Sequence, residues 1–189
     1  MTVPAEVLLV RDFVNSYEPQ VDEEALSTPG SLRDWFVTRG LLPATARLDE
    51  ADLAATKAVR EGIRSMLLGH AGHPADNGAI DAGNRVLAGL QVRLEFGTDG
   101  YRLVPGRETA LDQALVGLLE AIRQATEAHT WTRLKVCDRG SCRWAYYDAS
   151  RNQSRRWCSM AGCGNHIKMK RAYASRVARG AAGSGAGGD

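Results

Sequence analysis

Cysteine is absent from the first 136 residues of this sequence, and long apolar runs are absent from all of it. No stretch approaches the roughly 18 apolar residues of a membrane span, so we expect no transmembrane helix. The N-terminal segment MTVPAEVLLVRDF has neither a positively charged start nor a long apolar core, so we expect no secretory signal. From these absences we expect a cytoplasmic protein that has no membrane partner.

Signatures of common enzyme classes are missing as well. The sequence contains no G-x-S-x-G, no Walker loop and no H-E-x-x-H. His70 and His73 lie close together in a predicted loop at a helix end, with Asp76 nearby. Histidines in such loops are more often exposed to solvent than catalytic. We therefore expect that this protein is not an enzyme.

The four cysteines of the sequence all fall within 27 residues near its C-terminal end. Cys137, Cys142, Cys158 and Cys163 form the pattern C-x4-C-x15-C-x4-C, which suits a tetrahedral Zn²⁺ held by four thiolates. Two disulfides or unpaired thiols are the alternatives, but clustered cysteines in a reducing cytoplasm are more often metal ligands. Four protein ligands close the coordination sphere, so this zinc would stabilise the fold and not perform catalysis.

Charge is divided unevenly along the chain. Residues 1–132 carry 12 Lys and Arg against 19 Asp and Glu, a balance of −7, whereas residues 133–179 carry 12 against 2, a balance of +10. A basic segment of this kind predicts a polyanionic partner, most commonly nucleic acid. A merely solvated charged face is the alternative, and the coincidence of the charge with the cysteine cluster disfavours it.

Apolar spacing predicts mostly helical structure over residues 1–132. Helices are expected near residues 7–15, 29–39, 49–68, 79–90 and 108–128. Thr28 is placed as an N-cap before Pro29, and Gly40 is placed as a C-terminal stop. Alternation on both sides of the turn at residues 97–100 predicts a β-hairpin. Trp131, at the end of this part, is expected to pack between two domains.

The basic segment has the order of a small zinc finger. We expect a strand over residues 134–136 and a ligand turn over 137–142, in which Gly140 takes a positive φ. A second hairpin would pair residues 143–148 with 155–157, and a helix would run from Cys163 to about Arg179. This order resembles a treble-clef finger.

The predicted final helix has two faces. Met169 and Tyr173 lie on its apolar side, which we expect to cover the finger's hairpin together with Trp144 and Trp157. Core packing is the favoured role for these two tryptophans, and stacking on nucleic-acid bases is the alternative. Lys168 lies on the opposite, basic side.

The predicted fold class is therefore α+β. A helix-dominated N-terminal domain with a β-hairpin would span residues 1–132, and the treble-clef-like finger would span residues 133–179. The glycine-rich tail, residues 180–189, has nothing to bury and is expected to be disordered.

Two regions resemble known families. The stretch CDRGSCRWAYYDASRNQSRRWCSMAGCGN, residues 137–165, resembles the CGNR-type zinc finger. Upstream, DFVN at residues 12–15 and TPGSL at 28–32, running to RGLL at 39–42, resemble the ABATE domain that usually precedes that finger. The resemblance implies a bacterial, stress-induced transcription regulator that binds zinc through the four cysteines and DNA through the finger.

One position departs from the CGNR signature, because the sequence reads Cys163-Gly164-Asn165-His166. If the family's arginine contacts phosphate, His166 is a weaker substitute, since histidine is mostly neutral at pH 7. A fifth metal ligand and an ordinary surface residue in the first helical turn are the alternatives for His166.

The function that we expect is DNA-binding transcription regulation. The residues expected to contact the phosphates of double-stranded DNA are Arg151, Arg155, Arg156, Lys168 and Arg171. One finger covers a small interface, so a homodimer on two half-sites is attractive. The alternative functions are a zinc-stabilised protein-interaction adaptor and an RNA-binding protein.

The N-terminal domain would then sense a signal or mediate dimerisation. A small-molecule effector could bind in a pocket between its helices and the hairpin. Asp12, Asn15 and Trp35 are weak candidates for the lining of that pocket, and capping or core packing is the favoured alternative for each.

Overall fold

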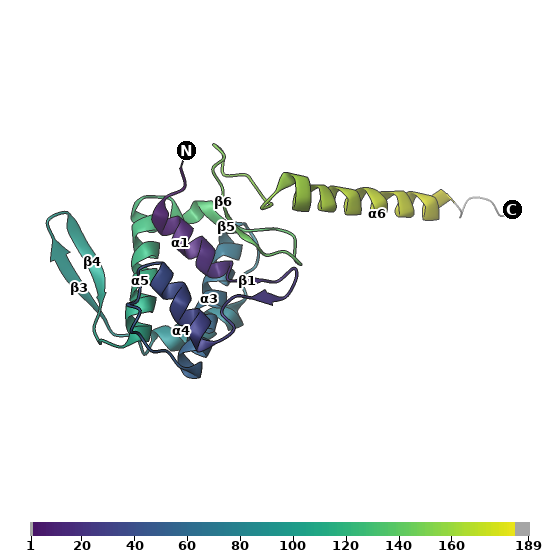
Figure 1. The fold of residues 1–189 in the computed structure, drawn as a ribbon. Coiled ribbons are helices and arrows are strands. Elements are labelled where there is room, and N and C mark those ends of the chain that lie inside the picture. Colours follow the sequence, from purple (N-terminus) through teal and green to yellow (C-terminus); the bar gives the residue numbers. More distant parts are fainter. Residues whose placement is uncertain (1, 184–189) are drawn as a thin grey trace.

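The computed structural model describes residues 2–183, apart from the side chains of Arg171, Ser175 and residues 177–183 in the last helix (Figure 1). The elements in chain order are α1 (Ala5–Val14), β1 (Tyr17–Glu18), β2 (Glu23–Glu24), α2 (Pro29–Thr38), α3 (Glu50–His70), α4 (Asn77–Leu87), β3 (Val92–Gly97), β4 (Gly100–Pro105), α5 (Ala110–Glu127), the 3₁₀ turn η1 (Trp131–Arg133), β5 (Leu134–Val136), β6 (Ala145–Tyr147), the π-helical turn η2 (Met160–Gly164) and α6 (Asn165–Gly183). Helices dominate, and the strands form antiparallel pairs, which confirms the predicted α+β class. Among the described residues, none of the helices has the length and apolar character that a membrane span requires.

The boundaries of α2 follow from the local sequence. The Thr28 hydroxyl accepts a hydrogen bond from the Ser31 N–H at 3.1 Å, and the Ser31 hydroxyl accepts one from the Thr28 N–H at 3.0 Å. This reciprocal capping box satisfies two donors at the helix start, where Pro29 needs none. The helix ends before Gly40, whose φ of 69° lies in the left-handed region that glycine adopts without strain. Both predicted boundary signals are confirmed.

The longest helix, α3, carries two buried arginines. The guanidinium of Arg60 lies 2.7 Å from the carboxylate of Glu24, which belongs to the short β1–β2 hairpin. Apolar spacing gave no sign of this hairpin, because each strand has only two residues. Arg64 lies one turn further along α3 and contacts the C-terminal part of the chain, as described below.

One hydrophobic core joins the N-terminal helices to strands that lie beyond residue 133. Its fully buried side chains include Val7, Phe13, Leu32, Phe36, Leu67, Leu115, Leu118, Leu134 and Val136. Trp131 is 8% exposed and packs in the same core, which confirms a packing role at the junction. The boundary expected near residue 132 therefore separates two parts of the sequence whose buried side chains belong to the same hydrophobic core.

The buried hairpin β5–β6 has a different partner from the one predicted. Leu134, Lys135 and Val136 pair with Tyr147, Tyr146 and Ala145, respectively. The prediction that residues 155–157 form the partner strand of 143–148 was wrong. The Arg155 N–H donates to the Asp148 carboxylate and the Arg155 carbonyl accepts from the Tyr146 hydroxyl, so side chains take the place of a strand ladder there.

The predicted β3–β4 hairpin is confirmed, with Gly97 paired to Gly100 around a two-residue loop. It projects from the helical body, and β4 is the strand on the side of α5 (Figure 1). Every residue of β3 is exposed, and the Phe96 side chain is 92% exposed. The hairpin is therefore an arm and not a layer of the core.

The last helix, α6, also projects from the body (Figure 1). The expectation that its apolar side covers the finger's hairpin was wrong, since Met169 and Tyr173 are 73% and 70% exposed. Trp144 and Trp157 pack against the cysteines instead, and the hairpin is already covered by the helical core. Residues 180–183, expected in the disordered tail, belong to α6, and residues 184–189 lie outside the described part of the chain.

Candidate metal centre

The four cysteines converge from separate segments of the C-terminal part. Cys137 directly follows β5, Cys142 lies in the β5–β6 connection, Cys158 lies in a loop and Cys163 lies in η2. Their Sγ atoms all lie within 4.8 Å of one another. Cys158 Sγ is 3.8 Å from Cys142 Sγ and 3.7 Å from Cys163 Sγ.

These distances fit a metal site and not disulfides. A disulfide needs an S–S distance of about 2.05 Å, and all four cysteines are free. In a tetrahedron with metal–sulfur bonds of about 2.3 Å, neighbouring sulfurs are about 3.8 Å apart. The geometry therefore matches a tetrahedral ion with four sulfur ligands.

The electrostatics of the cluster favour a cation at its centre. Burial raises the pKa of Cys142 to about 11, and burial together with nearby sulfurs raises the pKa of Cys158. The pKa of Cys163 is lowered, because hydrogen bonds from Cys142, Cys158 and the Arg139 guanidinium outweigh its burial. Four thiolates this close repel one another, so a bound divalent cation would favour the ionised form of the whole set.

The ligand turn closes differently from the prediction. The Cys137 N–H donates to the Trp144 carbonyl at 2.9 Å, which brings the two ends of the β5–β6 connection together. Gly140 does not take a positive φ; the left-handed residue is Arg143, with φ of 49°. The Arg143 carbonyl accepts a hydrogen bond from Arg64 on α3 at 3.0 Å, and this tertiary contact holds the unusual backbone.

Both tryptophans of the finger pack against the cysteine cluster. Trp144 and Trp157 are partly buried beside Cys137, Cys142 and Cys163. The favoured packing role is therefore confirmed. The Trp157 indole N–H is buried and has no hydrogen-bond partner among the residues that the structure describes.

The finger is attached to the helical body through two polar side chains of that body. The Asn15 amide donates to the Ala145 carbonyl at 2.9 Å and accepts from the Ala145 N–H at 2.7 Å, so it extends the β6 edge. The Arg64 guanidinium binds the carbonyls of Val14 and Tyr17 as well as that of Arg143. These bonds join α1, α3 and the finger at a buried point.

The two histidines considered as loop residues join the same two parts of the chain. His70 Nδ1 lies 2.8 Å from the Leu134 carbonyl, and its ring packs edge-on against Trp131. His73 Nε2 lies 2.9 Å from the carboxylate of Asp138, directly after the first ligand. Nothing in the local sequence signals these contacts, because both partners lie more than 60 residues away.

The predicted phosphate contacts lie in different environments. Arg155 folds back onto the finger, where its guanidinium donates to the carbonyls of Trp157 and Cys158. Arg156 is half exposed and pairs with Asp138 at 2.6 Å. Arg151 and Lys168 are exposed, whereas the Arg171 side chain lies outside the described part. Among the predicted residues, Arg151 and Lys168 are therefore the most accessible to a polyanion.

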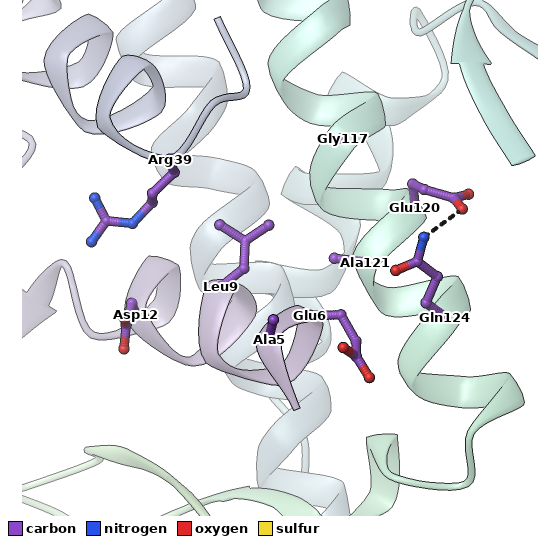
Figure 2. A pocket seen from close by; sticks show the side chains of 9 residues that line it. All are labelled: Ala5, Glu6, Leu9, Asp12, Arg39, Gly117, Glu120, Ala121 and Gln124. Atoms are coloured by element: carbon purple, nitrogen blue, oxygen red, sulfur yellow. Dashed lines mark hydrogen bonds between the residues drawn. The ribbon is translucent and has the colours of Figure 1, made fainter. Parts of the chain in front are cut away.

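Of the weak ligand candidates, Asp12 lines an open pocket of about 460 Å³ between α1 and α5 (Figure 2). Arg39, at the end of α2, lines the same pocket and stacks over the ring of Trp35 at 3.8 Å. Trp35 itself packs against Phe13, and Asn15 is engaged with the finger. Asp12 and Arg39 therefore line one pocket, whereas Trp35 packs in the core and Asn15 forms hydrogen bonds with the finger.

His166 is exposed in the first turn of α6 and is not one of the clustered ligands. Ser159 precedes it at the start of η2, where the Ser159 hydroxyl accepts from the Gly162 N–H at 3.2 Å. The second ligand pair thus enters α6 through a capped π-helical turn. Cys163 lies two residues before α6 and does not start it.

Fold and site together define a class: a helix-dominated α+β protein whose C-terminal part gathers four cysteines into a candidate metal site followed by a projecting helix. Comparison with known families agrees with this class. The CGNR zinc finger family matches residues 133–176. The ABATE family, which carries the description "Putative stress-induced transcription regulator", matches residues 9–135. The chain belongs to the ABATE family. No curated protein matches it.

Proposed function

We propose that this protein is a bacterial transcription regulator of the cytoplasm that binds double-stranded DNA through its finger. The observation that carries the proposal is α6, which leaves the metal centre and extends away from the body (Figure 1). Its 19 residues span about 28 Å, and the DNA major groove admits a helix of this kind. Lys168 and Lys170 are exposed on it and form no ion pair among the described side chains.

The acidic residues of the finger are both neutralised internally, which leaves its basic surface uncompensated. Asp148 is fully buried and pairs with Lys135 at 2.9 Å. Asp138 lies between His73 and Arg156. An incoming phosphate would therefore meet the cations of the finger without an exposed carboxylate nearby.

The metal in this proposal is one structural Zn²⁺ held by Cys137, Cys142, Cys158 and Cys163. When bound, the ion would supply a cross-link by neutralising the four thiolates, and four ligands leave no open position for catalysis. The residues of η2 then fix the start of α6, because the Gly164 N–H donates to the Ser159 carbonyl at 2.9 Å. The direction of the basic helix relative to the core would thus depend on the metal, and we assign the protein no enzymatic activity.

The N-terminal part would transmit a signal through its contacts with the finger. A small-molecule effector would bind in the pocket of Figure 2, whose lining includes the charged residues Glu6, Asp12, Arg39 and Glu120. Its test is a ligand that shifts DNA affinity of the full chain and loses this effect in Arg39→Ala. A ligand whose effect survives that substitution would place the effector elsewhere.

The test of DNA binding is selection of bound sequences from a random duplex library with the zinc-loaded chain at physiological salt. An enriched motif would support a sequence-reading regulator. Binding without enrichment would support a phosphate-driven role. Absence of retained DNA, with zinc confirmed in the sample, would contradict the proposal and favour an adaptor, and preferential competition by RNA would favour an RNA-binding protein.

The salt dependence of DNA affinity tests which residues contact the phosphates. Lys168→Gln combined with Lys170→Gln should weaken DNA binding and reduce the slope of log K against log salt by about 2, because two phosphate contacts are lost. The control is Arg85→Gln, which removes an exposed positive charge from α4, outside the finger, and should leave the slope unchanged. Equal effects of the two changes would argue against α6 as the DNA-binding element.

A further inference from the structure

The projecting β3–β4 arm presents an apolar face that the described residues leave largely uncovered. The side chains on this face come from paired positions, Val92 with Pro105, Leu94 with Leu103 and Phe96 with Tyr101. Leu94 is 61% exposed and Phe96 is 92% exposed. Contiguous exposed apolar surface on a protein commonly marks an interaction site.

The arm also has one free edge. The Leu103 N–H on β4 donates to the Glu120 carboxylate of α5 at 2.9 Å, so this backbone group points away from β3. Leu94 is directly opposite Leu103, and in an antiparallel pair such residues both point outward when one of them does. The backbone groups of Val92, Leu94 and Phe96 therefore face the far side of β3. Unprotected edges of this kind favour pairing with another strand.

The sequence of β3 is complementary to itself in one antiparallel register. It reads Val92-Arg93-Leu94-Glu95-Phe96. A twofold axis at Leu94 places this leucine opposite its copy, Val92 opposite the partner's Phe96, and Arg93 opposite the partner's Glu95. Opposite charges then face each other on one side of the sheet and apolar side chains on the other, and both pairings are favourable across strands.

Backbone geometry limits the possible registers. The residues that exchange backbone hydrogen bonds between copies must be Val92, Leu94 and Phe96, because their backbone faces the free edge, so the twofold axis has to pass through a residue. An axis at Arg93 or at Glu95 would use the same backbone groups, but it would place Arg93 or Glu95 opposite its own copy. The backbone thus allows these three registers, and charge selects the one centred on Leu94.

We propose that the chain forms a twofold homodimer in which β3 pairs antiparallel with β3 of a second copy. The product is a four-stranded sheet in the order β4-β3-β3-β4, an isologous interface of the type that closes on itself. Because one strand per subunit buries a small area, we expect the dimer to dissociate in about the micromolar range. The proposal does not rest on DNA binding, although it would place two fingers on one assembly.

The experiment is sedimentation analysis of the full zinc-loaded chain across a range of concentrations, without DNA. The wild type should pass from monomer to dimer. Arg93→Glu should raise the dimer dissociation constant by about tenfold or more, since it places two pairs of like charges across the axis. Arg85→Glu on α4 makes the same charge change outside the arm and should leave the dimer unchanged.

Mixing two variants makes the test specific for this register. The second variant carries Glu95→Arg with Arg102→Glu, which inverts the ion pair between these side chains within the arm. It should dissociate alone for the same reason as Arg93→Glu, but an equimolar mixture of the two should form heterodimers, because every charge pair across the axis is again opposite. Circular dichroism would check that each variant is folded.

Three results would overturn the proposal: a wild type that stays monomeric at every concentration, a dimer that Arg93→Glu leaves intact, or a mixture that forms no heterodimer. Each of them is independent of any DNA measurement. A failure of the dimer is therefore distinguishable from a failure of the proposed DNA-binding function.

Discussion

The hairpins β3–β4 and β5–β6 are both antiparallel, but one is largely exposed to solvent and the other is buried. β3–β4 has six paired positions and projects from the body, with every β3 residue exposed. β5–β6 has only three paired positions, and all six residues are buried. An isolated two-stranded hairpin is marginally stable in water. The shorter hairpin is therefore held by the core and the ligand turn, whereas the longer one depends on its own turn, on the contacts of β4 with α5 and, as we propose, on a second copy.

Removal of one proposed metal ligand should give the largest difference in structural order between the two hairpin regions. Cys158→Ser should abolish zinc binding and disorder the finger beyond β6, because structural zinc contributes directly to the folding of such modules. β3–β4, which has no contact with the cysteines, should keep its structure. Metal content by mass spectrometry and amide hydrogen exchange would measure both effects.

Ser141→Ala, an exposed change inside the ligand turn, is the control for this variant and should retain the metal. Full zinc content in Cys158→Ser would contradict the four-thiolate site.

The second prediction concerns the charge buried under β5–β6. The Asp148 carboxylate, whose pKa is lowered to about 2 because bonds from Ser150 and Lys135 outweigh its burial, accepts four hydrogen bonds. Asp148→Asn would leave the Lys135 ammonium buried without a counter-ion and should cost about 3–5 kcal/mol in the free energy of unfolding.

Ser150→Ala removes a neutral hydroxyl that donates to the same carboxylate and should cost less, about 1.5–3 kcal/mol, which is the range for a hydrogen bond to a charged group. Denaturant unfolding would compare the two variants. Equal losses would mean that the charge of Asp148 contributes nothing beyond an ordinary hydrogen bond.

The third prediction compares one leucine from each hairpin. Leu134 in β5 is fully buried, so Leu134→Ala should cost about 2–5 kcal/mol through lost packing and a cavity. Leu94 in β3 is 61% exposed, and Leu94→Ala should change the stability of the monomer by about 0.5 kcal/mol or less. Unfolding measured at a protein concentration below the dimer range would check this. A large loss in Leu94→Ala under those conditions would show that the arm packs on its own body.

The smallest expected effect is a pH dependence of the β5 contact. Burial lowers the pKa of His70 below its ordinary value of 6.5, and the charge of Lys135 lowers it further, against the opposing bond to the Leu134 carbonyl. The folded chain then binds fewer protons at this site than the unfolded chain. Stability from this site is therefore complete above about pH 6.5 and is lost as the pH falls below that value.

His70→Gln removes the titrating ring and should flatten this part of the stability profile between about pH 7.5 and 5.5. The matched control is His129→Gln, which changes an exposed histidine outside the contact. Denaturant unfolding at several pH values is the measurement. Parallel profiles for wild type and His70→Gln would exclude His70 as the source.

Local signals were sufficient for much of the fold. Thr28 and Gly40 marked the ends of α2 because a cap acts within a few residues of itself, and the alternation on both sides of Gly97 and Gly100 predicted the β3–β4 hairpin for the same reason. The predicted strand at residues 155–157 failed, because its backbone donor is taken by Asp148, a side chain outside the local pattern.

The sequence by itself determined the set of four cysteines that cluster, the helices and the charge asymmetry, since the spacing of the cysteines, apolar periodicity and residue counts need no knowledge of packing. Only the tertiary structure decided that Asn15, Arg64 and His70 join the finger to the helical body. Their partners lie 130, 79 and 64 residues away along the chain. It also decided which hairpin is buried and that α6 projects from the body without covering that hairpin. Local patterns depend on neighbours within a few residues, whereas burial depends on which distant elements pack together.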